Sequence, residues 1–169
     1  MCHVLRFNYI DISSVENYSG HIVGYKFLSV ENAPSRARRK VESNDILLST
    51  VRPNLQAFAF LDTIPDNTIA STGFAVLRSK PHISYSKYIY FMLFNSYIMQ
   101  QIINKMEKGS YPSINQTDIE NIILPLPPLE IQQEIVTQLE QEQQLVNNNK
   151  QLIEIMENKI KATISKVWN

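Results

Sequence analysis

Polar side chains that could bind phosphates or base edges collect in three separate stretches of the chain. The first stretch, residues 33–40, holds the densest positive charge, with Arg36, Arg38, Arg39 and Lys40. A guanidinium group donates hydrogen bonds through a planar fork, which matches both phosphate oxygens and the edge of guanine. The stretch is therefore either a nucleic-acid contact or a solvated basic loop.

The second and third stretches combine hydroxyl, amide and cationic groups. Residues 49–54 follow an apolar run and include Arg52 and Asn54, at a strand end where loop side chains can reach a ligand. Residues 108–116 include Lys108, Ser110 and Ser113. Side-chain and backbone donors together could grip a phosphate backbone. The same Ser, Thr and Asn residues could instead serve as turn and helix caps.

Composition restricts this chemistry to a local patch. The 169 residues carry 16 Lys and Arg against 16 Asp and Glu, so the chain is not a generic polyanion binder. Residues 1–128 hold 12 basic and 10 acidic side chains, whereas residues 129–169 hold 4 and 6. The excess of positive charge is small, so any nucleic-acid site would have to be a local patch.

Motifs of known catalytic sites are absent from the sequence. There is no glycine-rich phosphate loop, no Gly-x-Ser-x-Gly, no His-Glu-x-x-His, and no Asn-Pro-Pro-Tyr or Asp-Pro-Pro-Tyr of the kind that positions a base for methyl transfer. Cys2 is the single cysteine, and His3, His21 and His82 lack metal-ligand spacing. We therefore expect a non-catalytic chain with no metal or cofactor of its own. Without a secretory signal or an apolar run long enough for a membrane, the expected location is the cytoplasm.

The residue pattern predicts a β-rich domain that would position these groups. Strands are expected at residues 9–12, 21–28, 45–51, 56–61, 68–71 and 73–78. One amphipathic helix is expected over residues 86–105, where it would close the core of the sheet. A helical turn and a final strand are expected within residues 118–125. The predicted fold class is α+β, a β-rich mixed domain with a packing helix.

One long helix is predicted after the breaker run 124–128, because no Pro or Gly occurs from residue 129 onward. A helix of about forty residues would span about 60 Å, too long to cap one small domain. Its apolar residues follow a 3,4 alternation that suggests a coiled-coil seam. The seam positions are Ile135, Leu139, Val146, Asn149, Ile153, Met156 and Ile160. Asn149 would fix the register, and the alternative is that the helix packs back on its own domain.

Four of these stretches resemble the specificity subunit of type I restriction-modification systems. They are residues 46–54, 69–77, 109–115 and 124–135, and the basic run 33–39 fits the same subfamily. The matches occur in order and span nearly the whole chain. The most recognisable is the proline-to-helix junction Leu124-Pro125-Leu126-Pro127-Pro128 with the helix start after it.

The resemblance implies a target recognition domain, residues 1–125, followed by a spacer helix, residues 126–169. Full-length specificity subunits usually carry two such units, whose helices pair antiparallel and hold two DNA-reading domains apart. The subunit directs a methyltransferase subunit and a restriction and motor subunit to double-stranded DNA. S-adenosylmethionine, ATP and Mg would belong to those partner subunits.

The chain departs from the family pattern in two respects. It contains one unit, so it would be a half-subunit or a fragment. It also starts almost directly at the first predicted strand, whereas family members usually have a further stretch before that point, so the domain would be short at its N-terminus.

Two hypotheses follow. In the first, the domain docks in a major groove, with phosphate contacts from Lys40, Lys108, Ser110 and Ser113 and base-edge contacts among Arg36, Arg38, Arg39, Arg52 and Asn54. The long helix then pairs with a second copy or with another half-subunit. In the second, the chain is a helical scaffold that recruits a methyltransferase or another protein without reading DNA. A basic face built from the three stretches would favour the first hypothesis.

Overall fold

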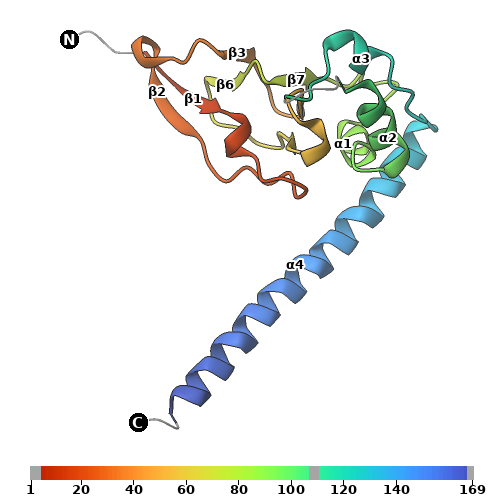
Figure 1. Ribbon diagram of the computed structural model, residues 1–169. Helices are drawn as coiled ribbons and strands as arrows, with labels where there is room; N and C mark the ends of the chain where they lie inside the picture. The colour runs from red at the N-terminus through yellow and green to blue at the C-terminus, as the bar shows by residue number, and fades with distance from the viewer. Residues whose placement is uncertain (1–4, 107–110, 167–169) are drawn as a thin grey trace.

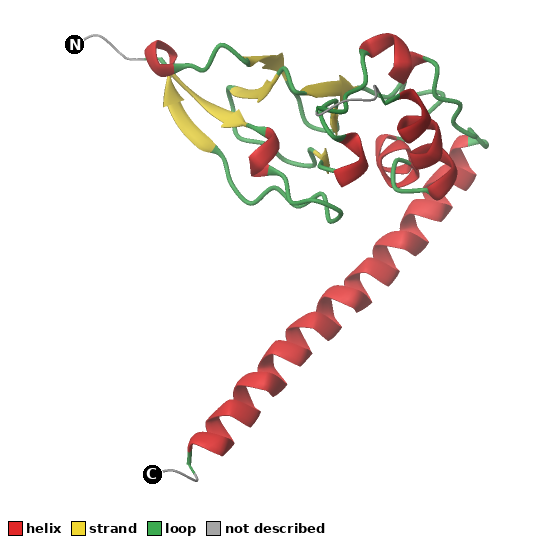
Figure 2. Cartoon of the chain, in the orientation of Figure 1, coloured by secondary structure: helices red, strands yellow, loops and turns green. Residues whose placement is uncertain are grey.

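Three layers and a projecting helix make up the computed structural model, which describes residues 5–106 and 111–166 (Figure 1). The strands are β1 (Arg6–Ile10), β2 (Lys26–Ser29), β3 (Ala37–Lys40), β4 (Ile46–Ser49), β5 (Phe58–Phe60), β6 (Thr68–Ser71) and β7 (Phe74–Leu77). The helices are α1 (Ser86–Met92), α2 (Ser96–Lys105), α3 (Gln116–Glu120) and α4 (Leu129–Ser165), with 3-10 turns at Ile12–Ser14, Val30–Asn32 and Pro53–Leu55. The predicted α+β class is confirmed (Figure 2).

The strands form two sheets. The first sheet has the order β2-β1-β6-β3, and its central pair, β1 and β6, is parallel. The second sheet has the order β5-β4-β7 and is antiparallel throughout. A tight turn between β6 and β7 carries the chain from one sheet to the other. The six strands expected within residues 9–78 all overlap observed strands, and the expected range 68–71 is that of β6.

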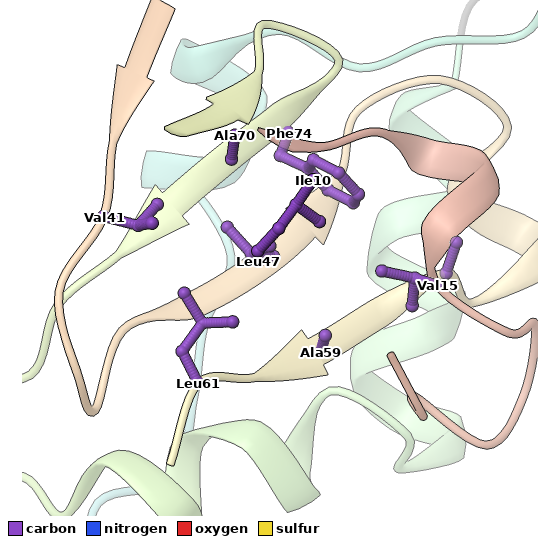
Figure 3. Packing of buried hydrophobic residues seen from close by; sticks show 9 residues of the cluster. Ile10, Val15, Val41, Leu47, Ala59, Leu61, Ala70 and Phe74 are labelled. Carbon is purple, nitrogen blue, oxygen red and sulfur yellow. The ribbon is translucent and has the colours of Figure 1, made fainter. Parts of the chain in front are cut away.

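Strand β4 is buried on both of its faces. Leu47 packs between the two sheets with Ile10 and Phe74, as Figure 3 shows. Ile46 and Leu48 point the other way, into a second core formed with the helix layer. Because side chains alternate along a strand, only an uninterrupted apolar run can supply both cores. All three residues are fully buried.

The helix layer corrects one prediction, because the single helix expected over residues 86–105 is wrong. The segment forms two helices, α1 and α2, separated at Asn95, whose side-chain Oδ1 accepts a hydrogen bond of 2.9 Å from Tyr97 N–H. Asn favours such caps over helix interiors because its side chain competes for backbone groups. The break lets Leu93 and Ile98 enter the same core.

The basic run is also different from the expected loop. Residues 37–40 form β3, which pairs antiparallel with β6 at an edge of the first sheet. The register shifts between Ala37 and Arg39, which is a bulge. Backbone pairing with β6 explains why a run of charged side chains is extended, since an edge strand leaves its side chains in solvent.

The final strand expected within residues 118–125 is also wrong. Residues 116–120 form α3, capped by Asn115, and residues 121–128 contain no strand. Three prolines in this segment have no N–H to donate to a sheet. The segment instead contributes Ile122 and Leu124 to the edge of the second core.

Helix α4 has 37 residues, a length of about 55 Å, and leaves the domain at α1 (Figure 1). Gln132 and Val136 are buried against the domain, whereas every residue from Glu140 to Lys166 is exposed. The alternative in which the helix folds back on its own domain is therefore wrong beyond its first three turns.

A carboxylate is buried next to the central strand. Asp45 is 1% exposed, and its side chain accepts hydrogen bonds of 2.7 and 2.8 Å from the guanidinium of Arg78 and one of 2.8 Å from Glu42 N–H. The bond to Asp45 raises the pKa of Arg78 still further above its normal high value. This pair ties the start of β4 to the end of β7.

We expect Arg78→Met to lower the free energy of unfolding by about 2 to 3 kcal/mol, because the Asp45 carboxylate would stay buried without its cation. Urea unfolding followed by circular dichroism measures this change. Lys80→Met removes an exposed cation two residues away and should change the free energy by less than about 0.5 kcal/mol. Equal effects of the two variants would contradict a stabilising role for the pair.

Candidate nucleic-acid interface

The structure brings the first and second polar stretches together through the β6–β7 turn. Thr72 N–H donates to the backbone oxygen of Arg36, a distance of 2.8 Å. Thr50 N–H donates to the backbone oxygen of Gly73, also at 2.8 Å, and the Thr50 hydroxyl donates to the same oxygen at 3.0 Å. The turn therefore connects the basic strand to the segment that follows β4.

The third polar stretch joins the second directly. Ile114 N–H donates to Thr50 O at 3.0 Å, and Arg52 N–H donates to Pro112 O at 2.8 Å. Val51 and Ser113 form an antiparallel bridge between these two bonds. Three stretches that are far apart in sequence thus form one hydrogen-bonded surface, which we call the polar edge: residues 36–40, 50–54, 71–74 and 111–116.

A cleft of about 520 Å³ opens on the polar edge. Each of the stretches contributes to its wall, through Arg39, Thr50, Thr72 and Asn115. Side chains of β7 and of Ile114 supply apolar surface to the same cleft. A cleft with a cation, hydroxyls and an amide around apolar surface can accept hydrogen-bonding groups and a flat ring together.

Cations are the main charge on β3. Arg36, Arg38, Arg39 and Lys40 are all exposed, and β3 is an edge strand that pairs with β6 on one side only. One donor of the Arg38 guanidinium is already used within the chain, because its Nε donates to Ser35 O at 2.7 Å. Charged side chains on an edge strand also prevent unwanted sheet pairing. Prevention of sheet pairing alone would not require the charges to lie beside a cleft, whereas Arg39 of this strand lines one.

Arg52 occupies a strained position. Its φ of 47° and ψ of 53° are left-handed, a region that costs a residue other than glycine about 1 to 2 kcal/mol. The exposed guanidinium lies 5.8 Å from the ring centre of Tyr111, within the range of a cation–π interaction. Tyr111 is 76% exposed, so both groups face solvent at the polar edge. Asn54 is exposed on the next turn.

The predicted site residues are thus partly brought together. Seven of them belong to the polar edge: Arg36, Arg38, Arg39, Lys40, Arg52, Asn54 and Ser113, with Ser113 half-buried in the bridge to Val51. Lys108 and Ser110 lie outside the described residues. Sequence reasoning missed Thr72 and the pairing of Tyr111 with Arg52. The polar Ser71-Thr72-Gly73 between two apolar runs was a turn signal that could have drawn attention to Thr72.

Within residues 5–106 and 111–166, no group of three or more His, Cys, Asp and Glu side chains is placed to hold a metal ion. No helix in the same ranges is both long and apolar enough to cross a membrane.

The predicted seam on α4 is exposed over most of its length. Ile135 and Leu139 are half-buried near the domain. Asn149 is exposed, as are Val146, Ile153, Met156 and Ile160, with exposed fractions of 46 to 58% for the four apolar residues. An apolar stripe of this length on one projecting helix is typical of a surface that another helix covers.

Comparison with known sequences identifies the family. Residues 6–158 match the type I restriction modification DNA specificity domain, a match that runs from β1 to near the end of α4. The chain therefore belongs to this family, which confirms the resemblance seen in its motifs.

Individual relatives agree with the assignment. The type I restriction enzyme HindI specificity subunit of Haemophilus influenzae is 25% identical over 157 residues, covering 89% of this chain and 34% of that protein. The crystal structure of the HsdS subunit from Thermoanaerobacter tengcongensis superposes with a TM-score of 0.78 at 34% identity, over 88% of this chain and 38% of the other. A structure described as the basis of complex assembly and conformational transition of the type I system gives a TM-score of 0.77 at 34% identity, with the same coverage. The chain spans about a third of the length of these relatives.

Arg52→Gly should leave the free energy of unfolding unchanged or raise it by up to about 1 kcal/mol, because glycine adopts the left-handed conformation without strain. Thermal unfolding measures the change. Asn54→Gly, two residues later in the Pro53–Leu55 turn, is the matched control and should be mildly destabilising through backbone entropy. A clear loss of stability in Arg52→Gly would show that the side chain is kept for structure.

Proposed function

We propose that residues 1–125 form a DNA target recognition domain that reads one half of a bipartite sequence, and that residues 126–169 set its distance from a second reader. The observation that carries this proposal is the polar edge, where backbone hydrogen bonds join the three polar stretches and the β6–β7 turn, and where Arg39, Thr50, Thr72 and Asn115 line one cleft. Exposed cations beside this cleft can contact the phosphates and base edges of double-stranded DNA. Family membership supports the same role.

The positions of the polar and charged side chains suggest two kinds of DNA contact. Lys40, at the end of β3, together with Lys108, Ser110 and Ser113, would contact phosphates and set the register on the duplex. Arg39, which lines the cleft, and Arg52, whose guanidinium lies beside the Tyr111 ring, are the first candidates for base-edge contacts. Arg36, Arg38 and Asn54 complete the candidate set.

A second copy, or another half-subunit, would cover the apolar stripe of α4. Charge favours an antiparallel arrangement. Residues 129–147 contain four Glu and no Lys or Arg, whereas residues 148–166 contain four Lys and two Glu, so the net charges are −4 and +2. Antiparallel pairing places the acidic half against the basic half, whereas parallel pairing would place like charges together.

The partners proposed for this assembly are a methyltransferase subunit and a restriction and motor subunit, which the family resemblance implies. The chain itself would be non-catalytic, and S-adenosylmethionine, ATP and Mg would be bound by those subunits. Such a complex acts on chromosomal DNA, so we place the chain in the cytoplasm.

The competing scaffold hypothesis, in which the chain recruits a protein without reading DNA, accounts for the helix but not for the domain. It gives no reason for four exposed cations to share an edge with a polar cleft. DNA reading explains both features.

We expect Arg36→Ala and Arg39→Ala to change the sequence preference, and to weaken binding to the parent's preferred DNA by about 5- to 150-fold where a bidentate base contact is lost. Selection from a random DNA pool followed by fluorescence anisotropy measures both. Lys40→Ala should weaken binding to all sequences alike and reduce the salt slope by about 1.

The matched control is Lys26→Ala, which removes a cation from β2 at the opposite edge of the same sheet. It should leave affinity and preference unchanged. If the three variants at the polar edge kept the parent's affinity for every sequence, the basic strand would be solvated charge and the proposal would fail.

The double variant Ile153→Glu with Met156→Glu should convert a two-chain assembly into single chains, because it places charge in the seam. Light scattering would then give about 19.5 kDa instead of twice that mass. Ile155→Glu is the matched control, since Ile155 is equally exposed but lies outside the 3,4 spacing. An unchanged mass in the double variant would exclude pairing through this stripe.

A further inference from the structure

The first turns of α4 contain a fully buried polar side chain. Gln132 is 0% exposed, although glutamine is normally a surface residue. Its Oε1 accepts a hydrogen bond of 2.9 Å from Tyr85 N–H, and its Nε2 donates to Ile83 O at 3.0 Å and to Pro127 O at 2.7 Å. Both amide hydrogens and the amide oxygen are thus used. If the amide were rotated by half a turn, its NH2 group would face the N–H of Tyr85 and its oxygen would face the carbonyl oxygens of Ile83 and Pro127. The hydrogen bonds therefore fix one orientation of the amide.

These three bonds, together with the 3.0 Å bond from the Tyr88 hydroxyl to Pro125 O, hold the helix layer to the proline connection and to α4. Tyr85 is the residue before α1, and its own side chain does not cap that helix. Pro127 lies in the connection that has no secondary structure. Gln132 therefore links the entry of α1, the proline connection and the start of α4 at a single buried point.

The rest of the contact between α4 and the domain is narrow. Val136 is 1% exposed, and Lys87 Nζ lies 2.6 Å from Glu140 Oε1, a bond that raises the pKa of Lys87 and keeps it charged. Residues 132, 136 and 140 follow the four-residue spacing of one helix face. The apolar contact is not directional, and a surface ion pair contributes at most about 1 kcal/mol. Only the amide of Gln132 has the geometry to fix an angle.

A small angle at this point has a large effect at the far end of the helix. The exposed part, from Glu140 to Ser165, is about 39 Å long. A rotation of about 10° at the base moves its end by roughly 7 Å, which equals about two base-pair steps of DNA at 3.4 Å each.

We propose that Gln132 is a positioning residue that fixes the direction of α4 relative to the polar edge, and thereby the spacing between the two DNA half-sites that an assembly can read. Only the statement about half-site spacing rests on the proposed function. The statement about the direction of α4 does not, because that direction can be measured without DNA.

The test compares Gln132→Met with Gln133→Met in the full chain. The two substitutions make the same chemical change, but Gln133 is exposed. Spin labels are attached at Thr63→Cys in the domain and Asn158→Cys on α4, in a Cys2→Ser background, and diluted with unlabelled chain so that distances within one chain are read. Pulsed electron resonance should show a broadened or shifted distance distribution in Gln132→Met, with the helix content of the parent, and the parent's distribution in Gln133→Met.

The second measurement uses DNA with the two selected half-sites at a series of spacings. The parent should prefer one spacing, and Gln132→Met should lower the preference over spacings two base pairs longer or shorter by at least five-fold while each half-site is still read. An unchanged distance distribution overturns the proposal. A changed distribution with the parent's spacing preference overturns the connection to spacing.

A further variant covers the case in which Gln132→Met does not fold. Gln132→Asn keeps the amide but is one methylene shorter, so it cannot reach Tyr85 and Pro127 together, and it should broaden the distribution in the same way. Failure of the parent to bind any selected DNA would reject the proposed function, whereas the distance measurement would still decide whether Gln132 orients the helix.

Discussion

Burial of β4 on both faces is the constraint on which the other layers depend. The alternating side chains of Ile46, Leu47 and Leu48 belong to two different cores, so one short strand holds the first sheet on one side and the helix layer on the other. Such a strand has no solvent-facing side to absorb a change, and a substitution in it would disturb both cores. The domain is therefore organised outward from these residues.

The same strand determines where the polar edge lies. As the chain leaves β4, the Ser49 hydroxyl donates to Val51 O at 2.7 Å, and Thr50 makes its two bonds to Gly73 O. These bonds hold the segment against the β6–β7 turn before it reaches Arg52. The left-handed backbone of Arg52 is then supported by the bond of its N–H to Pro112 O. A recognition surface built on loops stays precise only when a rigid scaffold holds it, and here the scaffold is the fully buried strand.

Sequence reasoning succeeded where one local signal determined the outcome. The apolar run at residues 45–51 could only be a buried strand, and the absence of Pro and Gly after Pro128 specified a long helix. Sequence reasoning failed where tertiary contacts determined the secondary structure. Nothing local shows that Arg39 and Lys40 would pair with β6, or that a capping Asn95 would split one amphipathic pattern into two helices. The three polar stretches were recognised, but their convergence depends on backbone bonds between residues 23 to 64 positions apart, which spacing alone does not reveal.

Gln132 lies three residues before Ile135, the first seam position, so the 3,4 spacing extends to it, but the structure buries its side chain against the domain. The start of α4 and the rest of the helix therefore have different contacts. The helix uses its first three turns to dock on α1 and leaves the later apolar positions free, so one continuous helix connects the domain to a separate pairing surface. Covering the four exposed apolar seam residues of each chain would contribute on the order of 1 kcal/mol per residue, which is similar in total to the cost of association, about 4 to 15 kcal/mol. Pairing through this stripe should therefore be weak alone and depend on concentration. Two half-sites on one DNA molecule would hold two chains near each other and raise their effective concentration. DNA would therefore favour an assembly whose half-site spacing matches the direction of α4 set at Gln132.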